Sequence, residues 1–354
     1  MRLLPTLAVS LLVLGQAQGQ DQNYGIAVSK TGEEASEAFH AWIGSRDMKP
    51  QYPAQIHITF DMEMDMGMSG EDPFMDMDFE MDTRLLIESP EAMRSWGQID
   101  LAVKADANNE FDGEFDFQFA SDDTGMRFLL DDHGAIQEKL GMDIPKAYSL
   151  SADRGKIFMD AYAKSVVEMI NVVTPEGHEP IAALENGVIG LFHPISMTYM
   201  MANYPGLKIV GWGVKDGKVL LQTQADFEML EEIMPQEMIP FDMNEFRDIV
   251  YTMVMDHESG ALLEYSIDLE IPMDSSMMDE DLGFSGNIGF KMSMRAEPAS
   301  ASAPSVSLPD ASLVMDLDGP FDMYWPMVQT MLEMQASQFE SMKGEQDSND
   351  DFDF

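Results

Sequence analysis

The chain has 354 residues, of which 45% are hydrophobic and 24% are charged. This hydrophobic share excludes a disordered polymer and is enough to build one large domain or two small ones. The charge is one-sided, since 64 acidic residues stand against 20 basic ones and the net charge is −44. Nucleic acid and anionic membrane surfaces would be repelled over most of the exterior, so we expect no nucleic-acid partner.

Residues 1–19 have the pattern of a secretory signal peptide. Arg2 supplies one positive charge, a short apolar core runs to Gly15, and Ala17-Gln18-Gly19 is a small-x-small cleavage site. We therefore expect a periplasmic or secreted protein whose mature chain starts near Gln20. The apolar core is too short to span a bilayer, and no other segment has transmembrane length. The chain has no cysteine, which excludes disulfides, so packing alone must hold the fold.

A helix is predicted over 33–43, with acidic residues in its first turn and an apolar stripe that contains Phe39 and Trp42. After it, methionine or phenylalanine alternates with aspartate or glutamate, most regularly over 60–66, 75–82 and 111–119. A period of two places alternate side chains on opposite faces of a sheet. The pattern predicts antiparallel strands with one Met/Phe face and one carboxylate face. The predicted strands are 54–68, 73–88, 96–105, 110–120 and 126–132.

In the middle of the chain the strand periodicity gives way to helical periodicity. Helical periodicity over 156–173 and an apolar stretch over 187–204 predict a helical insert at 156–204. Strands return at 207–214 and 219–227, joined by a tight turn at Asp216-Gly217. A second hairpin is predicted over 248–270, and a final long strand over 286–295.

A Met-rich amphipathic helix is predicted over 321–342, within a segment bounded by 318 and 343. Packing of this helix against the domain is the interpretation we favour. A handle for an envelope protein partner is the alternative, because Met327, Met331, Met334 and Met342 lie near one face. The acidic tail, 344–354, is expected to be disordered.

The order of these elements resembles that of the periplasmic lipoprotein-carrier superfamily, the LolA-like and LppX/LprG-like proteins. The hairpin from Ile249 to Glu264 is similar to that family's pattern of apolar strand, Asp, turn, Gly and apolar strand. The stretch 191–204 resembles its lid, and Ser307-Leu308-Pro309-Asp310-Ala311 its closing segment. The resemblance covers roughly residues 30–317 and implies an open, strongly curved half-barrel with a lidded apolar cavity. The domain would span 20–317, with the lid at 156–204.

Methionine is flexible and polarizable, which suits a surface that re-packs around varied guests. The 34 methionines therefore favour an adaptable cavity, while ordinary core packing explains them equally well. We expect the cavity to be lined by residues of the alternating strands and of the lid. These are Phe60, Met62, Met64, Met66, Met75, Met77, Phe79, Met81, Phe115, Phe117, Met197, Tyr199, Met200 and Met201.

Binding of Cu(I) by these methionines is a more specific alternative to an apolar cavity. Met62, Met64 and Met66 place thioethers on one strand face at a spacing of about 6.6–6.8 Å, and thioethers select Cu(I). However, no His stands among them, and burial in a core produces the same pattern. A calcium loop beginning at Asp106 fails because Phe111 and Phe117 occupy its sixth and twelfth positions. We therefore expect no dedicated metal site and no cofactor.

Catalysis finds little support in the sequence. His178-Glu179 and His257-Glu258 lack the second histidine of a zincin helix, and no Ser-His-Asp set can be nominated. We therefore expect an α+β fold whose strongly curved antiparallel sheet forms a half-barrel with an N-terminal helix, a helical lid and a C-terminal helix. Its expected function is non-catalytic binding of a lipid, an acyl chain or a lipidated protein. The alternatives are a Met-based Cu(I) binder and an acidic structural protein without ligand.

Overall fold

The computed structural model describes residues 24–46, 49–68, 73–89, 92–105, 111–122, 125–131, 133–141, 143–157, 160–161, 193–203, 207–226, 250–273, 284–299 and 314–330. The predicted signal peptide at 1–19, most of the insert 156–204, the segment 307–311, the calcium-like stretch 106–110 and the tail 344–354 lie outside these residues.

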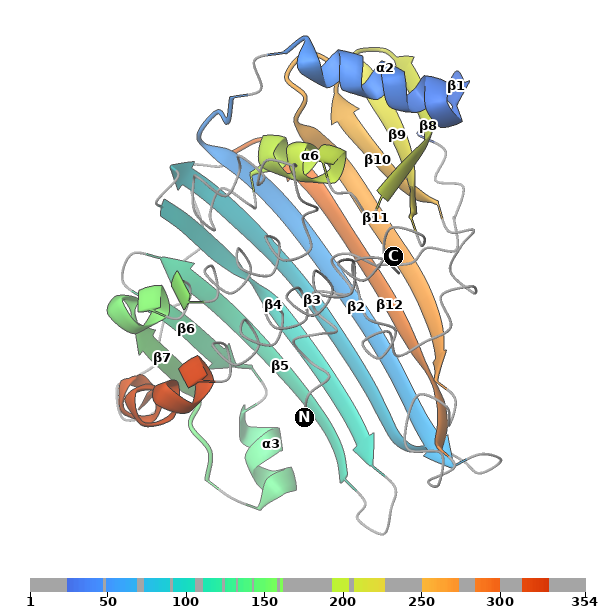
Figure 1. Cartoon of the computed structure of the whole chain (residues 1–354). Helices are drawn as coiled ribbons and strands as arrows, with labels where there is room; N and C mark the ends of the chain where they lie inside the picture. Colours follow the sequence, from blue (N-terminus) through green and yellow to red (C-terminus); the bar gives the residue numbers. More distant parts are fainter. Residues whose placement is uncertain are drawn as a thin grey trace, which may run out of the picture.

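The described residues form an α+β structure dominated by one large sheet of 13 strands (Figure 1). The strand order is β1-β8-β9-β10-β11-β12-β2-β3-β4-β5-β6-β7-β13, and β1 and β13 are its two edges, so the sheet is not closed. The strands are β1 (Lys30–Thr31), β2 (Ala54–Met68), β3 (Pro73–Ser89), β4 (Ala92–Ala105), β5 (Phe111–Asp122), β6 (Gly125–Leu130), β7 (Ala147–Ser151), β8 (Leu207–Lys215), β9 (Lys218–Ala225), β10 (Tyr251–Asp256), β11 (Leu262–Met273), β12 (Phe284–Glu297) and β13 (Val314–Asp316).

The alternating segments form the long central strands, as their period of two predicts. β2 and β3 pair antiparallel from Ala54↔Ile87 to Gly67↔Pro73, and β4 and β5 continue the meander. The turn at Asp216-Gly217 is also confirmed, since φ is 51° at Asp216 and 74° at Gly217. Positive φ at both central residues is the geometry of the tight hairpin turn that Asp-Gly favours.

The hairpin that carries the family resemblance is present as β10 and β11. Its turn is held by Asp256, whose Oδ1 accepts hydrogen bonds from the backbone amides of Glu258 (3.1 Å) and Ser259 (2.7 Å). Burial raises the pKa of Asp256, but the hydrogen bonds from Ser259 and Glu258 outweigh it and leave this pKa below its usual value. Gly260 closes the turn with φ at 76°.

The expectation of a purely antiparallel sheet is wrong at one edge. β13 pairs with β7 in parallel, from Val314↔Ala147 to Asp316↔Ser149. Neither strand was predicted, and neither were β1 and the helix α3 (His133–Leu140). These elements are short and carry little alternation, so their local pattern is weak and the neighbouring long strands decide their conformation.

Helices α2 (Gly32–Gly44) and α6 (Pro194–Asn203) cover one face of the sheet at one end (Figure 1). The predicted apolar stripe of α2 is confirmed, since Phe39 is 0% and Trp42 is 6% exposed. Trp42 meets Trp212 of β8 edge to face, with ring centroids 5.5 Å apart. Trp42 Nε1 also donates to the carbonyl of His257 (3.2 Å), which ties α2 to the β10–β11 turn.

Residues 318–330 are helical and form the described part of the predicted C-terminal helix. Its start is fixed to the sheet edge, because Asp318 accepts a hydrogen bond from the Ser151 amide (2.8 Å) and Arg154 pairs with Asp322 (2.9 Å). Met327, however, is 59% exposed, as are Met323 (67%) and Tyr324 (56%). The helix is therefore docked by its first turn, while these three side chains remain in contact with solvent.

Gly97 in β4 allows a close approach between two central strands. A Cβ at this position would overlap the backbone carbonyl oxygen of Asp82 and lie 2.8 Å from Cα of Thr83, so no side chain fits there without moving β3. Glycine inside a strand often marks a bend or such a close approach. By this argument Gly97 is needed for the geometry of the sheet centre.

We expect Gly97→Ala to lower the free energy of unfolding by about 1–3 kcal/mol, the usual cost of forcing atoms into filled space. Urea denaturation followed by circular dichroism measures this change. Gly134→Ala in α3 is the matched control, since nothing lies within 4 Å of a Cβ there and alanine in a helix stabilises by roughly 0.5–1 kcal/mol over glycine. Equal midpoints for Gly97→Ala and the wild type would contradict the requirement for glycine.

Candidate ligand-binding face

The strand register aligns the Met and Phe side chains of neighbouring strands on one face of the sheet. Phe60 of β2 lies opposite Met292 of β12 and Met81 of β3, and the row continues through Ile99 and Phe117. Directly opposite residues of an antiparallel ladder point to the same side. We call the side of the central strands β11, β12, β2, β3, β4 and β5 that carries these residues the apolar face.

A second row runs parallel to the first and is built in the same way. Met62 lies opposite Phe290 and Phe79, and Phe79 is followed by Leu101 and Phe115. The two rows meet in an aromatic contact, because the Phe60 ring lies 5.5 Å from that of Phe79 and 4.9 Å from that of Phe290, both edge to face. Met64 opposite Met77 begins a third row.

The apolar face is tightly packed at one end. Phe39 and Trp42 of α2 and Met197 of α6 form one core cluster with residues of β8 to β12. Met253 of β10 is fully buried there, and Phe290 is 2% exposed. Phe60 lies at the border of this cluster, against which it is partly buried. The helices therefore fill this end of the face.

Further along the strands the same face is only partly buried. Met62, Met64, Met77, Phe79, Met81, Ile99, Leu101, Phe115 and Phe117 all keep intermediate exposure, and none belongs to the core cluster. A contiguous apolar surface that stays partly accessible typically marks a binding site. We call these nine residues the half-buried patch.

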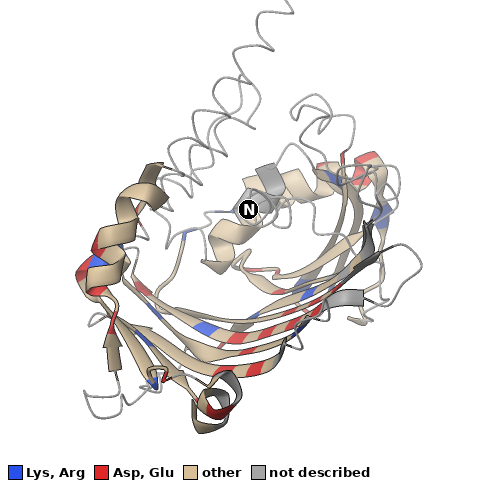
Figure 2. Ribbon diagram, turned by 90° about the horizontal axis from the view of Figure 1, so that it is seen from below, with Lys and Arg blue, Asp and Glu red and all other residues tan. Residues whose placement is uncertain are grey.

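Charge is absent from the described side chains of the apolar face. Aspartate, glutamate, lysine and arginine of the six central strands occupy the alternate positions, which appear as red and blue stripes along the ribbon (Figure 2). By the register these positions share the opposite side, which we call the acidic face. The polar side chains described on the apolar face are hydroxyls, those of Thr83, Ser95, Ser121 and Tyr265.

Carboxylates face one another across the acidic face. Asp61, Glu80, Asp100 and Asp116 stand in one register row. Burial raises the pKa of Asp100, and the charge of Asp116 and a hydrogen bond with it raise this pKa further. Within the described residues, no group of three or more His, Asp or Glu side chains is placed to hold a metal ion.

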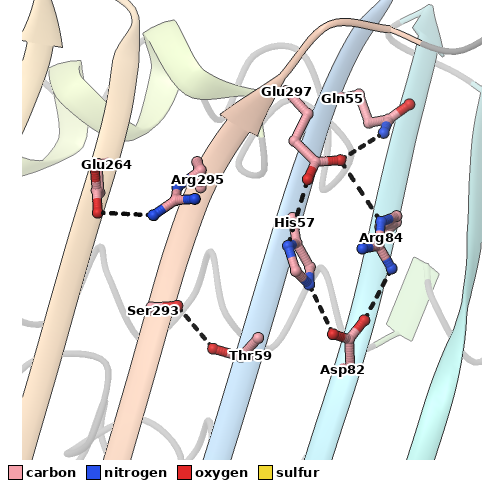
Figure 3. Close-up of polar contacts among 9 residues, drawn as sticks. All are labelled: Gln55, His57, Thr59, Asp82, Arg84, Glu264, Ser293, Arg295 and Glu297. Atoms are coloured by element: carbon pink, nitrogen blue, oxygen red, sulfur yellow. Dashed lines mark hydrogen bonds and ion pairs between the residues drawn. The ribbon is translucent and has the colours of Figure 1, made fainter.

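At the other end of the acidic face a polar ring joins β12, β2 and β3 (Figure 3). His57 Nε2 lies 2.9 Å from Asp82 Oδ2, and its Nδ1 lies 3.4 Å from Glu297 Oε1. Arg84 closes the ring, with Nη1 3.0 Å from Asp82 Oδ1 and Nε 3.6 Å from Glu297 Oε2. Both imidazole nitrogens thus face carboxylates of neighbouring strands. The ring is arranged to connect strands.

The structure places the predicted lining residues in three groups. Phe60, Met62, Met64, Met77, Phe79, Met81, Phe115 and Phe117 share the partly buried stretch of the apolar face. Met197 is 6% exposed and belongs to the packed end instead. Met66 and Met75 pair in the β2–β3 register and Tyr199, Met200 and Met201 lie on α6, but the side chains of these five are outside the described residues.

Several residues of the apolar face were not predicted from the sequence. Ile99 and Leu101 of β4, and Phe290 and Met292 of β12, extend the same rows. Both segments alternate with period two, so the signal was present in Ile99-x-Leu101-x-Val103 and in Ile288-x-Phe290-x-Met292. Carboxylates alternate less regularly there, which made these stretches less conspicuous than the Met-Asp repeats.

His193 caps the start of α6 and was also missed. Its Nδ1 accepts a hydrogen bond from the Ile195 amide (3.2 Å), so Nε2 carries the proton and donates to the carbonyl of Gln51 (3.0 Å). The side chain is buried, and its ring meets that of Tyr52 at 5.0 Å. Burial lowers the pKa of His193, against a smaller raising effect of the Gln51 hydrogen bond. The neutral imidazole thus fastens α6 to the segment that leads into β2.

No model of a known protein family matches this chain, and no curated protein is detectably similar to it. None of the helices in the described part of the chain is long and apolar enough to cross a membrane.

The His193 cap predicts a stability that depends on pH. Because its pKa is lowered on folding, the unfolded chain takes up a proton first as the pH falls below about 6.5. The cap therefore stabilises the fold above this pH and loses its contribution below it. We expect His193→Asn, which can cap but does not titrate, to show a weaker loss of unfolding free energy between about pH 7.5 and 5 than the wild type.

Urea unfolding at the two pH values measures this difference. His40→Asn, at an exposed position of α2, controls for the removal of one histidine. If His193→Asn and His40→Asn leave the same pH dependence, the neutral cap does not control the stability.

Proposed function

We propose that this protein is an exported, non-catalytic carrier or sensor that holds a lipid, an acyl chain or a lipidated protein against its apolar face. The observation that carries the proposal is the half-buried patch: nine Met, Phe, Ile and Leu side chains in register, partly accessible and free of charge. A hydrocarbon chain placed on such a surface loses contact with water along its length.

We further propose that the sheet is the strongly curved half-barrel that the resemblance to the lipoprotein carriers implies, with the guest on its inner side. Two features support this. The ribbon bends around the side on which α2 lies (Figure 2), and Gly97 permits a close approach of β3 and β4 at the centre. Curvature would surround the guest with neighbouring strands and increase the contact per methylene.

The energy available is sufficient for a specific complex. Burial of a chain supplies about 0.8 kcal/mol per methylene before the cost of ordering chain and side chains. The unbranched methionines of the patch can adjust to a flexible guest at little strain. The segment 187–204, which contains α6, would gate access, because Met197 of α6 packs at the filled end of the same face.

Cu(I) binding is the second candidate. Met64 lies directly opposite Met77, and Met66 is paired with Met75, which brings four methionine positions together on two strands. Thioethers are suitable Cu(I) ligands. The aromatic and aliphatic neighbours of these methionines across β4 and β5 fit an acyl chain better than a small ion.

Native mass spectrometry of the protein purified from its own cell envelope tests the proposal. We expect an adduct with the mass of a lipid, which is lost on extraction with organic solvent. A copper mass would favour the second candidate, and an apo mass under gentle conditions would favour an acidic structural protein without ligand.

A substitution pair locates the site. Met62→Glu places a charge on the half-buried patch and should weaken binding of a fluorescent acyl-chain probe by about tenfold or more, since an uncompensated charge opposes burial of a chain. Met62→Leu keeps the surface apolar and should bind nearly as the wild type does. Circular dichroism and urea midpoints show whether both variants are folded. Unchanged probe affinity in folded Met62→Glu would place the ligand elsewhere.

A further inference from the structure

We propose that the guest is an uncharged acyl ester, such as an acylglycerol or a wax-type ester, and that the apolar face selects against acyl chains with an anionic head group. This inference rests on the proposed function, since it concerns the chemistry of the same face. It adds a prediction about which lipid class is bound.

The described side chains of the apolar face include no counter-ion for an anion. A carboxylate or phosphate that loses water must be paired or hydrogen-bonded, because an isolated buried ion is strongly unfavourable. Among the described side chains of the six central strands, every Lys and Arg lies on the acidic face. An anionic head group drawn onto the apolar face would find no cation in these strands.

The arginines Arg84, Arg94 and Arg295 on the acidic face are already paired. Arg84 contacts Asp82 at 3.0 Å, Arg94 contacts Glu88 at 3.1 Å, and Arg295 contacts Glu264 at 3.2 Å. If one of these arginines paired with a lipid anion instead, its carboxylate partner would be left without a cation. A rearrangement of these arginines therefore does not readily supply a cation.

The carboxylates behind the apolar face produce an electrostatic field that also disfavours anions. Asp61, Glu63, Asp78 and Glu80 occupy the other side of the same single layer of backbone as Met62 and Phe79. The chain as a whole carries −44. This distribution makes the potential near the sheet negative, which lowers the local concentration of anions and disfavours their binding.

Uncharged polar groups, by contrast, can be accommodated. The Ser95 and Ser121 hydroxyls lie at partly exposed positions of the apolar face and can donate to an ester carbonyl or accept from a glycerol hydroxyl. The polar chemistry of the face thus matches esters and alcohols.

The test compares two ligands that share one acyl chain, monopalmitin and palmitate, at low ionic strength and about pH 9, where palmitate is ionised and the carboxylates of the protein stay charged. Both are titrated below their aggregation thresholds by displacement of a neutral fluorescent acyl-chain probe. We expect palmitate to bind at least about tenfold more weakly than monopalmitin.

A pair of variants separates the local from the global effect of charge. Met62→Lys and Asp61→Asn each raise the net charge by the same amount, but only Met62→Lys places a cation on the apolar face. We expect Met62→Lys to raise the affinity for palmitate relative to that for monopalmitin several-fold. Asp61→Asn should change this ratio of affinities little. Equal effects of the two variants would mean that the overall field alone sets the preference, and would overturn the counter-ion argument.

The outcomes distinguish the two proposals. If neither ligand displaces the probe and the probe itself does not bind, the carrier function fails. If palmitate binds as well as monopalmitin or better, the carrier function stands and selection for uncharged esters is overturned. Should Met62→Lys not fold, the comparison of the two ligands on the wild-type protein remains decisive.

Discussion

The structure depends on one constraint, the strand register that keeps the described carboxylates of the central strands on one side. Asp61 stands opposite Glu80 and Met62 opposite Phe79 because β2 and β3 pair at this offset and no other. A slip by one residue would turn the whole set of carboxylates onto the apolar face. The cost of burying even one unpaired charge is large, so the alternation itself enforces the register over the length of the long strands.

The same alternation creates two different environments on one face. Where α2 and α6 cover the sheet, Met253 and Phe290 are as buried as residues of any core. Where these helices do not reach, Met62 and Phe79 keep partial exposure although their spacing and chemistry are the same. The difference between core and candidate site therefore arises from the cover provided by helices, which the strands themselves do not encode.

This explains which features could be predicted from the sequence. The long strands and the helix around Phe39 follow from local periodicity, and their predicted bounds agree with the structure to within a few residues. The pairing of β12 with β2 joins residues more than two hundred positions apart and has no local signal. β13 and β7 are too short to carry a pattern, and the cap by His193 depends on the carbonyl of Gln51, far away in sequence.

The candidate site shows the same division. Phe60, Met62 and Phe79 could be placed on one face by counting, whereas Met197, which we expected to line the cavity from the lid, is packed in the core cluster. Periodicity identifies the side of a strand on which a residue lies. Whether that side is covered depends on the three-dimensional position of α6, which periodicity does not contain.

The excess of acidic residues has a physical consequence for the apolar face. A sheet with a partly accessible Met/Phe surface is prone to bury it against a second copy of itself. Because each such sheet carries a layer of carboxylates directly behind that surface and the chain carries −44, two copies approach under strong mutual repulsion. An uncharged, flexible guest meets no such barrier. The acidic face can therefore keep the apolar face available for a ligand while opposing its self-association, which links the two most unusual features of the composition, its methionine content and its charge.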